Sequence, residues 1–163
     1  MPNKHVEYME AITERYNALG YAPYGWVRAD SPPALTPLGK PLSECRIGMM
    51  STSGAYVRGQ TAYYYKDDTS TRAIPKGTPK DEIHFSHLTE NYLVSPRKDP
   101  DCIVPLTALR RLEDEGVIGE VADEVYSCMG GIYSQRRVID ELIPDLTEKF
   151  RAQKVDAAFL VPM

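Results

Sequence analysis

The chain has 163 residues, of which 42% are hydrophobic and 26% are charged, and its formal net charge is −4. This length and composition are typical of one globular domain. The acidic balance and the lack of a Lys/Arg block exclude a basic nucleic-acid or anionic-membrane binder. No apolar run reaches the roughly 18 residues of a transmembrane helix, and the polar first residues do not resemble a signal peptide. We therefore expect a cytoplasmic protein without nucleic-acid or membrane partners.

The three cysteines, Cys45, Cys102 and Cys128, form no CxxC pair. This pattern predicts neither a disulfide framework nor a zinc site. Free cysteines behave most often as small buried apolar side chains, and we expect this of all three. Asp99 and Asp101 are too few to hold a cation, so the sequence predicts no metal site.

The first part of the chain is predicted to be a helix followed by an arm. Residues 4–19 place apolar side chains at spacings of three and four, and Gly20 supplies a C-terminal stop. Residues 21–43 contain five prolines and several aromatic residues, which favours an ordered arm over a flexible linker. We expect two parts, with the helix and arm at 1–40 and an α/β domain at 41–163.

The rest of the chain alternates between strands and helices. Strands are predicted at 46–51, 62–65, 83–88, 124–129 and 155–161, the last of them buried, while 66–80 reads as a charged, turn-rich segment. Helices are predicted at 106–115 and 134–153, and Pro144 should kink the second one. A strand, helix and strand between about 124 and 161 form a βαβ unit. The predicted fold class is α/β, an open and mainly parallel sheet with flanking helices and a Pro/Tyr-rich N-terminal arm.

Two turns that follow predicted strands are candidates for anion binding. Ligands of open α/β sheets bind beyond the carboxyl ends of the strands. Ser53 and Gly54 follow the first strand, and Gly130 and Gly131 follow the strand at 124–129. Backbone N–H groups at such turns and at a helix N-terminus can bind a carboxylate or phosphate. The alternative is an ordinary turn in each case, the second one with Ser134 as helix N-cap.

Arg72 and His87 are further candidates. Arg72 offers a guanidinium fork for a substrate carboxylate, although a solvated loop containing Asp67 and Asp68 is the plainer interpretation. His87, at the end of a predicted strand, is a candidate for general acid–base catalysis, although a histidine in this setting more often has a structural role. His84 lies three residues away, on the opposite face of a strand, so the two should not share a metal.

Several motifs occur in an order that resembles a known family. They are Cys45–Gly54, Asp68–Pro75, Ser86-His87, Asp99–Leu106, Leu109–Leu112, Glu115–Gly119 and Cys128–Gly131. The order resembles the selenoprotein B component of the glycine, sarcosine, betaine and D-proline reductases, and the resemblance covers about residues 40–163. Asp101 stands where the family pattern leads us to expect asparagine.

The resemblance implies a reductase subunit that cleaves a C–N bond of a small amino acid or its derivative. Under this hypothesis the candidate residues named above would line the substrate side of the cleft: Ser53, Gly54, Gly130 and Gly131 would bind an anion, Arg72 would pair with a carboxylate and His87 would transfer a proton. The resemblance also implies a partner reductase subunit, on which a pyruvoyl group activates the substrate.

The redox residue of the resembling family is a selenocysteine or cysteine directly after the strand that corresponds to 155–161. None of the three cysteines takes that position, so we expect no cofactor in the chain as given and a selenocysteine in a full-length form. Because UGA encodes selenocysteine and otherwise means stop, we expect the end at Met163 to be a misread selenocysteine codon.

Two other interpretations remain open from the sequence. The first is a non-catalytic α/β module that binds a small anion or docks onto a partner, and that can form a homo-oligomer through the edge of its last strand. The second is a thiol enzyme that uses Cys128 beside Gly130 and Gly131. The sequence decides neither the substrate nor the electron donor.

Overall fold

The computed structural model describes residues 7–23, 25, 30–32 and 36–163. The chain divides into two compact units, residues 1–36 and residues 37–163. Parts of the predicted helix (4–6) and of the predicted arm (24, 26–29 and 33–35) lie outside the described residues.

The first unit contains the helix α1 (Tyr8–Ala18), which falls within the predicted range 4–19. Gly20 ends it as expected, with a φ of +83° and with its N–H donating to the carbonyl of Asn17. The apolar side chains of α1 are not buried within the described residues. Tyr16 instead packs against Tyr21, with 5.8 Å between the ring centroids.

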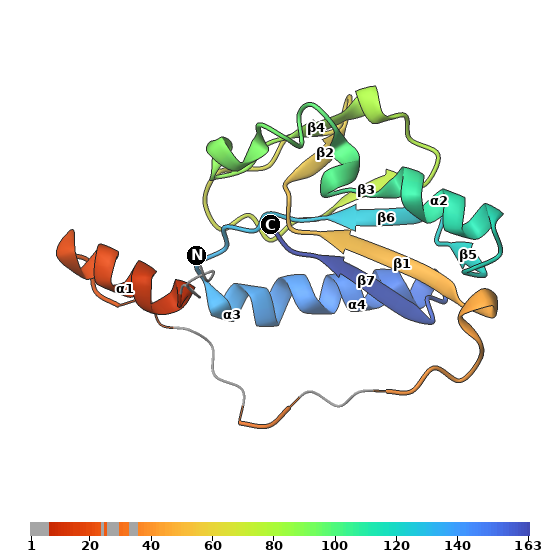
Figure 1. Cartoon of the computed structure of the whole chain (residues 1–163), viewed down its shortest axis with the longest axis horizontal. Helices are drawn as coiled ribbons and strands as arrows, with labels where there is room; N and C mark the ends of the chain where they lie inside the picture. Colours follow the sequence, from red (N-terminus) through yellow and green to blue (C-terminus); the bar gives the residue numbers. More distant parts are fainter. Residues whose placement is uncertain (1–6, 24, 26–29, 33–35) are drawn as a thin grey trace, which may run out of the picture. The chain divides into compact units, whose positions relative to one another are not determined.

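The second unit is built on a five-stranded sheet with β1 (Arg46–Ser51) at its centre. The other strands are β3 (Arg72–Pro75), β5 (Glu120–Val121), β6 (Glu124–Ser127) and β7 (Ala157–Val161). β1 pairs in parallel with β5 and β6 on one side and with β7 on the other (Figure 1). β3 extends the sheet antiparallel to β6. The predicted α/β class with a mainly parallel sheet is confirmed.

Helices cover both faces of this sheet (Figure 1). The helix α2 (Leu106–Asp114) packs Leu106 and Leu109 into a cluster with Met49 and Val125. The long connection from β6 to β7 packs on the opposite face, where Tyr126 meets Leu142 and Leu146. Alternate residues of β6 thus enter opposite cores, as expected for a strand covered on both faces.

The connection from β6 to β7 contains an irregular helix. It consists of α3 (Gln135–Arg137), a π-helical turn η5 (Val138–Leu142) and α4 (Ile143–Ala152). Pro144 has no N–H to donate to the preceding turn, and the π-helical turn lies immediately before α4. The predicted disturbance at Pro144 is therefore a local widening of the helix. Ser134 is the predicted N-cap, since its hydroxyl accepts a hydrogen bond from the N–H of Arg137.

A small second sheet follows directly after Gly54. Its strands are β2 (Ala55–Val57) and β4 (Ile83–Phe85), which pair antiparallel. Short 3-10 helices, η1 (Leu42–Glu44), η2 (Lys80–Glu82), η3 (Glu90–Leu93) and η4 (Pro100–Cys102), complete the fold. β4 is shorter than the predicted strand at 83–88, so that His87 lies in the loop beyond it.

Two local predictions were wrong. Residues 62–65 are a loop rather than a strand, because Tyr63 turns inward and its hydroxyl donates to the carbonyl of Ser127 over 2.6 Å. Residues 72–75, predicted to be turn-like, form β3, because the backbone of β6 offers an antiparallel partner that local sequence does not reveal.

The exposure of the last strand and of one cysteine also differs from expectation. β7 is not buried: Phe159 and Leu160 are 47% and 57% exposed, because β7 pairs only with β1 among the described strands. Cys45 and Cys128 are buried as predicted, but Cys102, the last residue of η4, is exposed.

Candidate functional site

The carboxyl ends of three parallel strands meet at one edge of the sheet. The N–H of Thr52, just beyond β1, donates to the carbonyl of Val161 at the end of β7 over 3.1 Å. The hydroxyl of Thr52 in turn accepts the N–H of Met163 over 2.8 Å. The N–H of Gly54 donates to the carbonyl of Cys128, beyond β6, over 2.9 Å. These bonds fix the turns beyond β1, β6 and β7 to one another.

Gly54 brings a fourth segment to this edge. Its φ is +65°, and a Cβ at this position would lie 2.1 Å from the carbonyl oxygen of Ser86. The Ser86 N–H donates back to the carbonyl of Gly54 over 3.0 Å. Only glycine combines this backbone conformation with such a close approach. Gly54 therefore allows the loop that carries His87 to lie against the end of β1.

His87 is buried between the turns, with 8% of its surface exposed. Its Nε2 lies 3.2 Å from the N–H nitrogen of Gly130, and its Nδ1 lies 3.1 Å from that of Thr89. The carbonyl of Thr52 also contacts the ring, while burial, the largest effect, lowers the pKa of His87. The imidazole is therefore neutral at pH 7 and joins three turns of the site.

The two glycines beyond β6 permit close contacts between the turns. A Cβ on Gly130 would lie 2.7 Å from the carbonyl oxygen of Thr52, and one on Gly131 would lie 2.9 Å from the side chain of Leu88. Gly130 is nevertheless exposed to solvent, whereas the preceding Met129 is buried. Gly130 is thus the most exposed residue of the predicted site, although its N–H points at the ring of His87.

Ser53 lies deeper than a ligand-binding side chain would. It is fully buried and pairs with Met129 across an isolated bridge. Its hydroxyl, like that of Ser51, has no hydrogen-bond partner among the described residues. The structure places Ser53 at the predicted edge, but its hydroxyl is enclosed by the protein.

Arg72 begins β3 and pairs in register with Ser127, so it lies at the same edge of the sheet. Its Nε donates to the carbonyl of Thr61 over 2.7 Å and its Nη1 to the hydroxyl of Ser70 over 2.8 Å. Its guanidinium also lies over the ring of Tyr63, at 4.3 Å from the centroid. Arg72 thus stabilises the loop between β2 and β3, and the N–H groups of its guanidinium donate to acceptors of the protein itself.

A carboxylate of the chain itself occupies the start of the helix beyond Gly131. One oxygen of Asp67 accepts the N–H groups of Tyr133 over 2.7 Å and Ser134 over 3.0 Å. Arg137 donates to the backbone carbonyl of Asp67. The sequence indicated that an anion would suit this place, but it gave no signal that Asp67 would be that anion. The pairing joins residues 66 positions apart along the chain.

The three cysteines are poor candidates for a nucleophile in this arrangement. Cys128 is 1% exposed, and burial raises its pKa to about 12, so its thiol is neutral. Cys45 is also buried, whereas Cys102 is exposed, with its pKa raised chiefly by desolvation. Among the described residues, no group of three His, Cys, Asp or Glu side chains is arranged to hold a metal ion.

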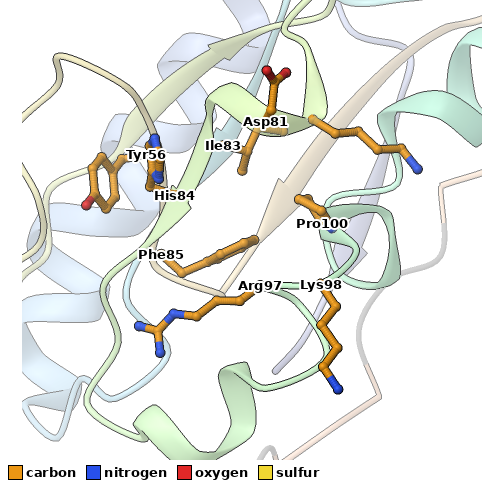
Figure 2. A pocket seen from close by; sticks show the side chains of 9 residues that line it. Tyr56, Asp81, Ile83, His84, Phe85, Arg97, Lys98 and Pro100 are labelled. Atoms are coloured by element: carbon orange, nitrogen blue, oxygen red, sulfur yellow. The ribbon is translucent and has the colours of Figure 1, made fainter.

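A separate groove lies between β4 and residues 97–100 (Figure 2). It encloses about 480 Å³ and is lined by Tyr56, Lys80, Asp81, Ile83, His84, Phe85, Arg97, Lys98 and Pro100. Two of its cations already have partners: Lys80 with Asp101 at 2.5 Å, and Arg97 with Glu90 at 2.6 Å. None of the predicted site residues Ser53, Gly54, Arg72, His87, Gly130 and Gly131 lines this groove.

Comparison with known proteins supports the resemblance drawn from the motifs. Residues 84–162 match the family model for glycine/sarcosine/betaine reductase selenoprotein B. The chain is also 27% identical, over 136 residues, to the D-proline reductase subunit gamma of Acetoanaerobium sticklandii. That match covers 83% of this chain and 55% of the relative, so the chain spans about half the length of that protein. The resemblance to the selenoprotein B family is confirmed.

No solved structure matches the chain. Within the described part of the protein, no helix has the length and apolar character needed to cross a membrane.

Replacing Gly54 by Ala tests the close approach of the His87 loop. The added Cβ meets the carbonyl of Ser86 in a backbone conformation that alanine disfavours, so we expect a loss of about 3 kcal/mol in the free energy of unfolding. Urea denaturation measures the change. Gly77→Ala is the control, since no atom lies within 4 Å of its Cβ position. Equal stability of the two variants would contradict the packing described for Gly54.

The depressed pKa of His87 predicts a loss of stability in acid. The pKa of His87 is lower in the folded protein than in the unfolded chain. The neutral ring therefore contributes fully to the free energy of unfolding above a pH of about 6.5. This contribution is lost as the pH falls from there through the folded pKa, because the unfolded chain binds the proton at a higher pH than the folded protein does. The urea midpoint should fall more steeply between pH 7.5 and pH 5 in the wild type than in His87→Gln. An unchanged slope in His87→Gln would refute the buried neutral state.

Proposed function

We propose that this relative of the selenoprotein B family forms the substrate side of a reductase subunit that cleaves a C–N bond of a small amino acid or its derivative. The observation that carries the proposal is the pair of hydrogen bonds between Thr52 and the end of β7. They fix the end of β7, after which the family resemblance expects the redox residue, to Thr52, whose carbonyl oxygen lies close to Gly130. The cytoplasmic location expected from the sequence belongs to this proposal.

The reaction has a defined balance. Cleaving the C–N bond of a protonated amine consumes two electrons and two protons, and it leaves a C–H bond and a protonated amine. The selenol or thiol of the expected redox residue supplies the nucleophile, and an external dithiol or equivalent reductant must restore it. A partner subunit with a pyruvoyl group, which activates the substrate, is part of the same proposal.

The chain's own residues have binding and proton-handling roles in this proposal. The Gly130 and Gly131 turn binds the substrate carboxylate, while Ser53 and Gly54 set the shape of the opposing turn. His87 moves a proton at the same edge, because its ring contacts both turns. Arg72 pairs with the carboxylate only after the loop that it braces has opened, since its donors now face the protein.

The family relation supports a reductase subunit, whereas the cysteines of this chain do not support a thiol enzyme. The neutral Cys128 thiol argues against a thiol enzyme that uses that residue. The relative in Acetoanaerobium sticklandii is named as a subunit of a D-proline reductase, which supports a partner subunit and a small amino-acid-like substrate here.

The test begins with the codon after Met163 and the reading frame beyond it. We expect UGA or a cysteine codon, followed by an open frame. The protein from that frame, expressed with selenocysteine insertion and with the neighbouring subunit genes, should release amine from glycine, sarcosine, betaine or D-proline in the presence of a dithiol. Replacing the redox residue by serine should abolish release. A UAA or UAG codon, or amine release that survives the serine substitution, would contradict the proposal.

Arg72→Ala in the same full-length protein tests the substrate side. We expect a rise in KM of at least about tenfold, in line with the loss of a charge-assisted contact. Arg58→Ala serves as the control, because Arg58 forms an exposed pair with Glu82 away from the sheet edge. Unchanged kinetics for Arg72→Ala would remove Arg72 from the substrate site.

A non-catalytic binding module is the second candidate. It is favoured by exposed aromatic rings next to the site, where Tyr64 and Tyr65 follow Tyr63, and Tyr133 lies beside Asp67. Such rings suit docking onto a partner. Binding of a small amino acid by the 163-residue chain, with no activity from any extended frame, would select this alternative.

A further inference from the structure

The strand β4 has a free edge. Among the described strands it pairs with β2 alone, in a sheet of two strands. The N–H of Ser86 donates to the carbonyl of Gly54 over 3.0 Å, which makes these two residues a bonded pair that continues the β2–β4 ladder. Bonded and non-bonded pairs alternate along an antiparallel ladder. The N–H and carbonyl groups of Ile83 and Phe85 therefore point away from β2.

These outward backbone groups of β4 are largely unpaired. The N–H of Ile83 donates to the carbonyl of Lys80 at the end of η2. The N–H of Phe85 and the carbonyls of Ile83 and Phe85 have no hydrogen-bond partner among the residues that the structure describes. Unpaired groups along the edge of a strand are a template for another extended chain.

The groove of about 480 Å³ runs along this free edge (Figure 2). Successive side chains of a strand point to opposite faces, yet Ile83 and Phe85 line the groove together with His84. The space that both faces of β4 share is the space beside its edge. The segment from Arg97 to Pro100 forms the opposite wall (Figure 2). The groove therefore has the position that an added strand would take.

The charges of the groove favour an acidic occupant. Arg97 and Lys98 lie at one end, whereas Asp81 lies at the other end with its carboxylate directed away from them (Figure 2). Of the cations that line the groove, Lys80 and Arg97 form ion pairs, and Lys98 forms none with a described residue. The partner of Arg97 is Glu90, and because both side chains are about half exposed, this pair contributes little. An incoming carboxylate can therefore pair with Lys98 and share Arg97.

We propose that the free edge of β4 binds an extended, acidic segment of a partner protein as an added strand. The backbone of the segment pairs with Ile83 and Phe85, and its carboxylates meet Arg97 and Lys98. A second copy of this chain does not fit, because its own β4 is already flanked by β2 and the groove is closed by residues 97–100. Binding here requires neither the substrate edge nor the redox residue of the function proposed above.

Nuclear magnetic resonance of the ¹⁵N-labelled 163-residue chain with a synthetic peptide tests the added strand. The probe is a capped peptide that alternates glutamate and valine, and its matched control has lysine in place of each glutamate. We expect the acidic peptide to shift the amides of Ile83, Phe85 and Lys98. At saturation it should slow hydrogen exchange of the Phe85 N–H about tenfold, which corresponds to one hydrogen bond gained. Unchanged exchange at Phe85, or equal effects of the two peptides, would overturn the proposal.

Lys98→Glu tests the preference for an acidic segment. Reversing this exposed charge should weaken binding of the acidic peptide about fivefold and strengthen binding of the lysine peptide. Lys66→Glu is the matched control, because it makes the same change in net charge at an exposed position that does not line the groove. Equal effects of the two substitutions would contradict the recognition of acidic residues at this end of the groove.

Hydrogen exchange in the protein without peptide distinguishes other occupants of the edge. We expect the Phe85 N–H to exchange readily before peptide is added. Protection that disappears on dilution would indicate a second copy of the chain, and protection that persists on dilution would indicate that the chain itself covers the edge. Either result would overturn the proposal, because the edge would then not be available to a partner.

Discussion

The hydrogen bonds that Thr52 makes to the end of β7 are the constraint on which the candidate site depends. Thr52 continues the central strand β1, and its N–H and hydroxyl hold the backbone of Val161 and Met163 in place. Because β1 also pairs with β6, the turn at Gly130 is fixed relative to the same residue. Three separate segments thus keep one geometry through a single threonine, and His87 joins them by contacting the Thr52 carbonyl.

The edge of the sheet combines tight packing with unsatisfied polar groups. Gly54 and Gly130 allow backbone contacts that any side chain would prevent. The hydroxyls of Ser51 and Ser53 are buried without a partner among the described residues, although buried polar groups are usually paired. Such exceptions tend to occur where function restricts the sequence, and here they lie at the carboxyl end of β1.

The sequence predicted those features that depend on local patterns. The strand at 46–51, the helices predicted at 4–19 and 106–115, and the cap at Ser134 follow from periodicity, glycine stops and hydroxyl capping. The structure contains the strand and the cap, and it contains helices at Tyr8–Ala18 and Leu106–Asp114. The Ser53, Gly54, Gly130 and Gly131 turns do meet at one edge, because parallel strands place their carboxyl ends together.

Features that depend on distant residues were not predictable in this way. β3 exists because β6 lies beside it, and Tyr63 turns inward because the carbonyl of Ser127 accepts its hydroxyl. The pairing of Asp67 with the helix N-terminus likewise depends on a loop that crosses the sheet edge. The hydrogen-bond partners of Arg72 belong to the same loop. The sequence did not show that this loop would turn its acceptors toward the Arg72 guanidinium.

The central claim is that a small amino acid binds at the shared carboxyl edge of β1, β6 and β7. Mapping of backbone amide shifts during a glycine titration of the 163-residue chain tests this claim most directly. The account predicts that the largest shifts occur at Thr52, Gly54, Gly130 and Gly131. Shifts confined to the groove beside β4, at Phe85 and Lys98, would contradict it.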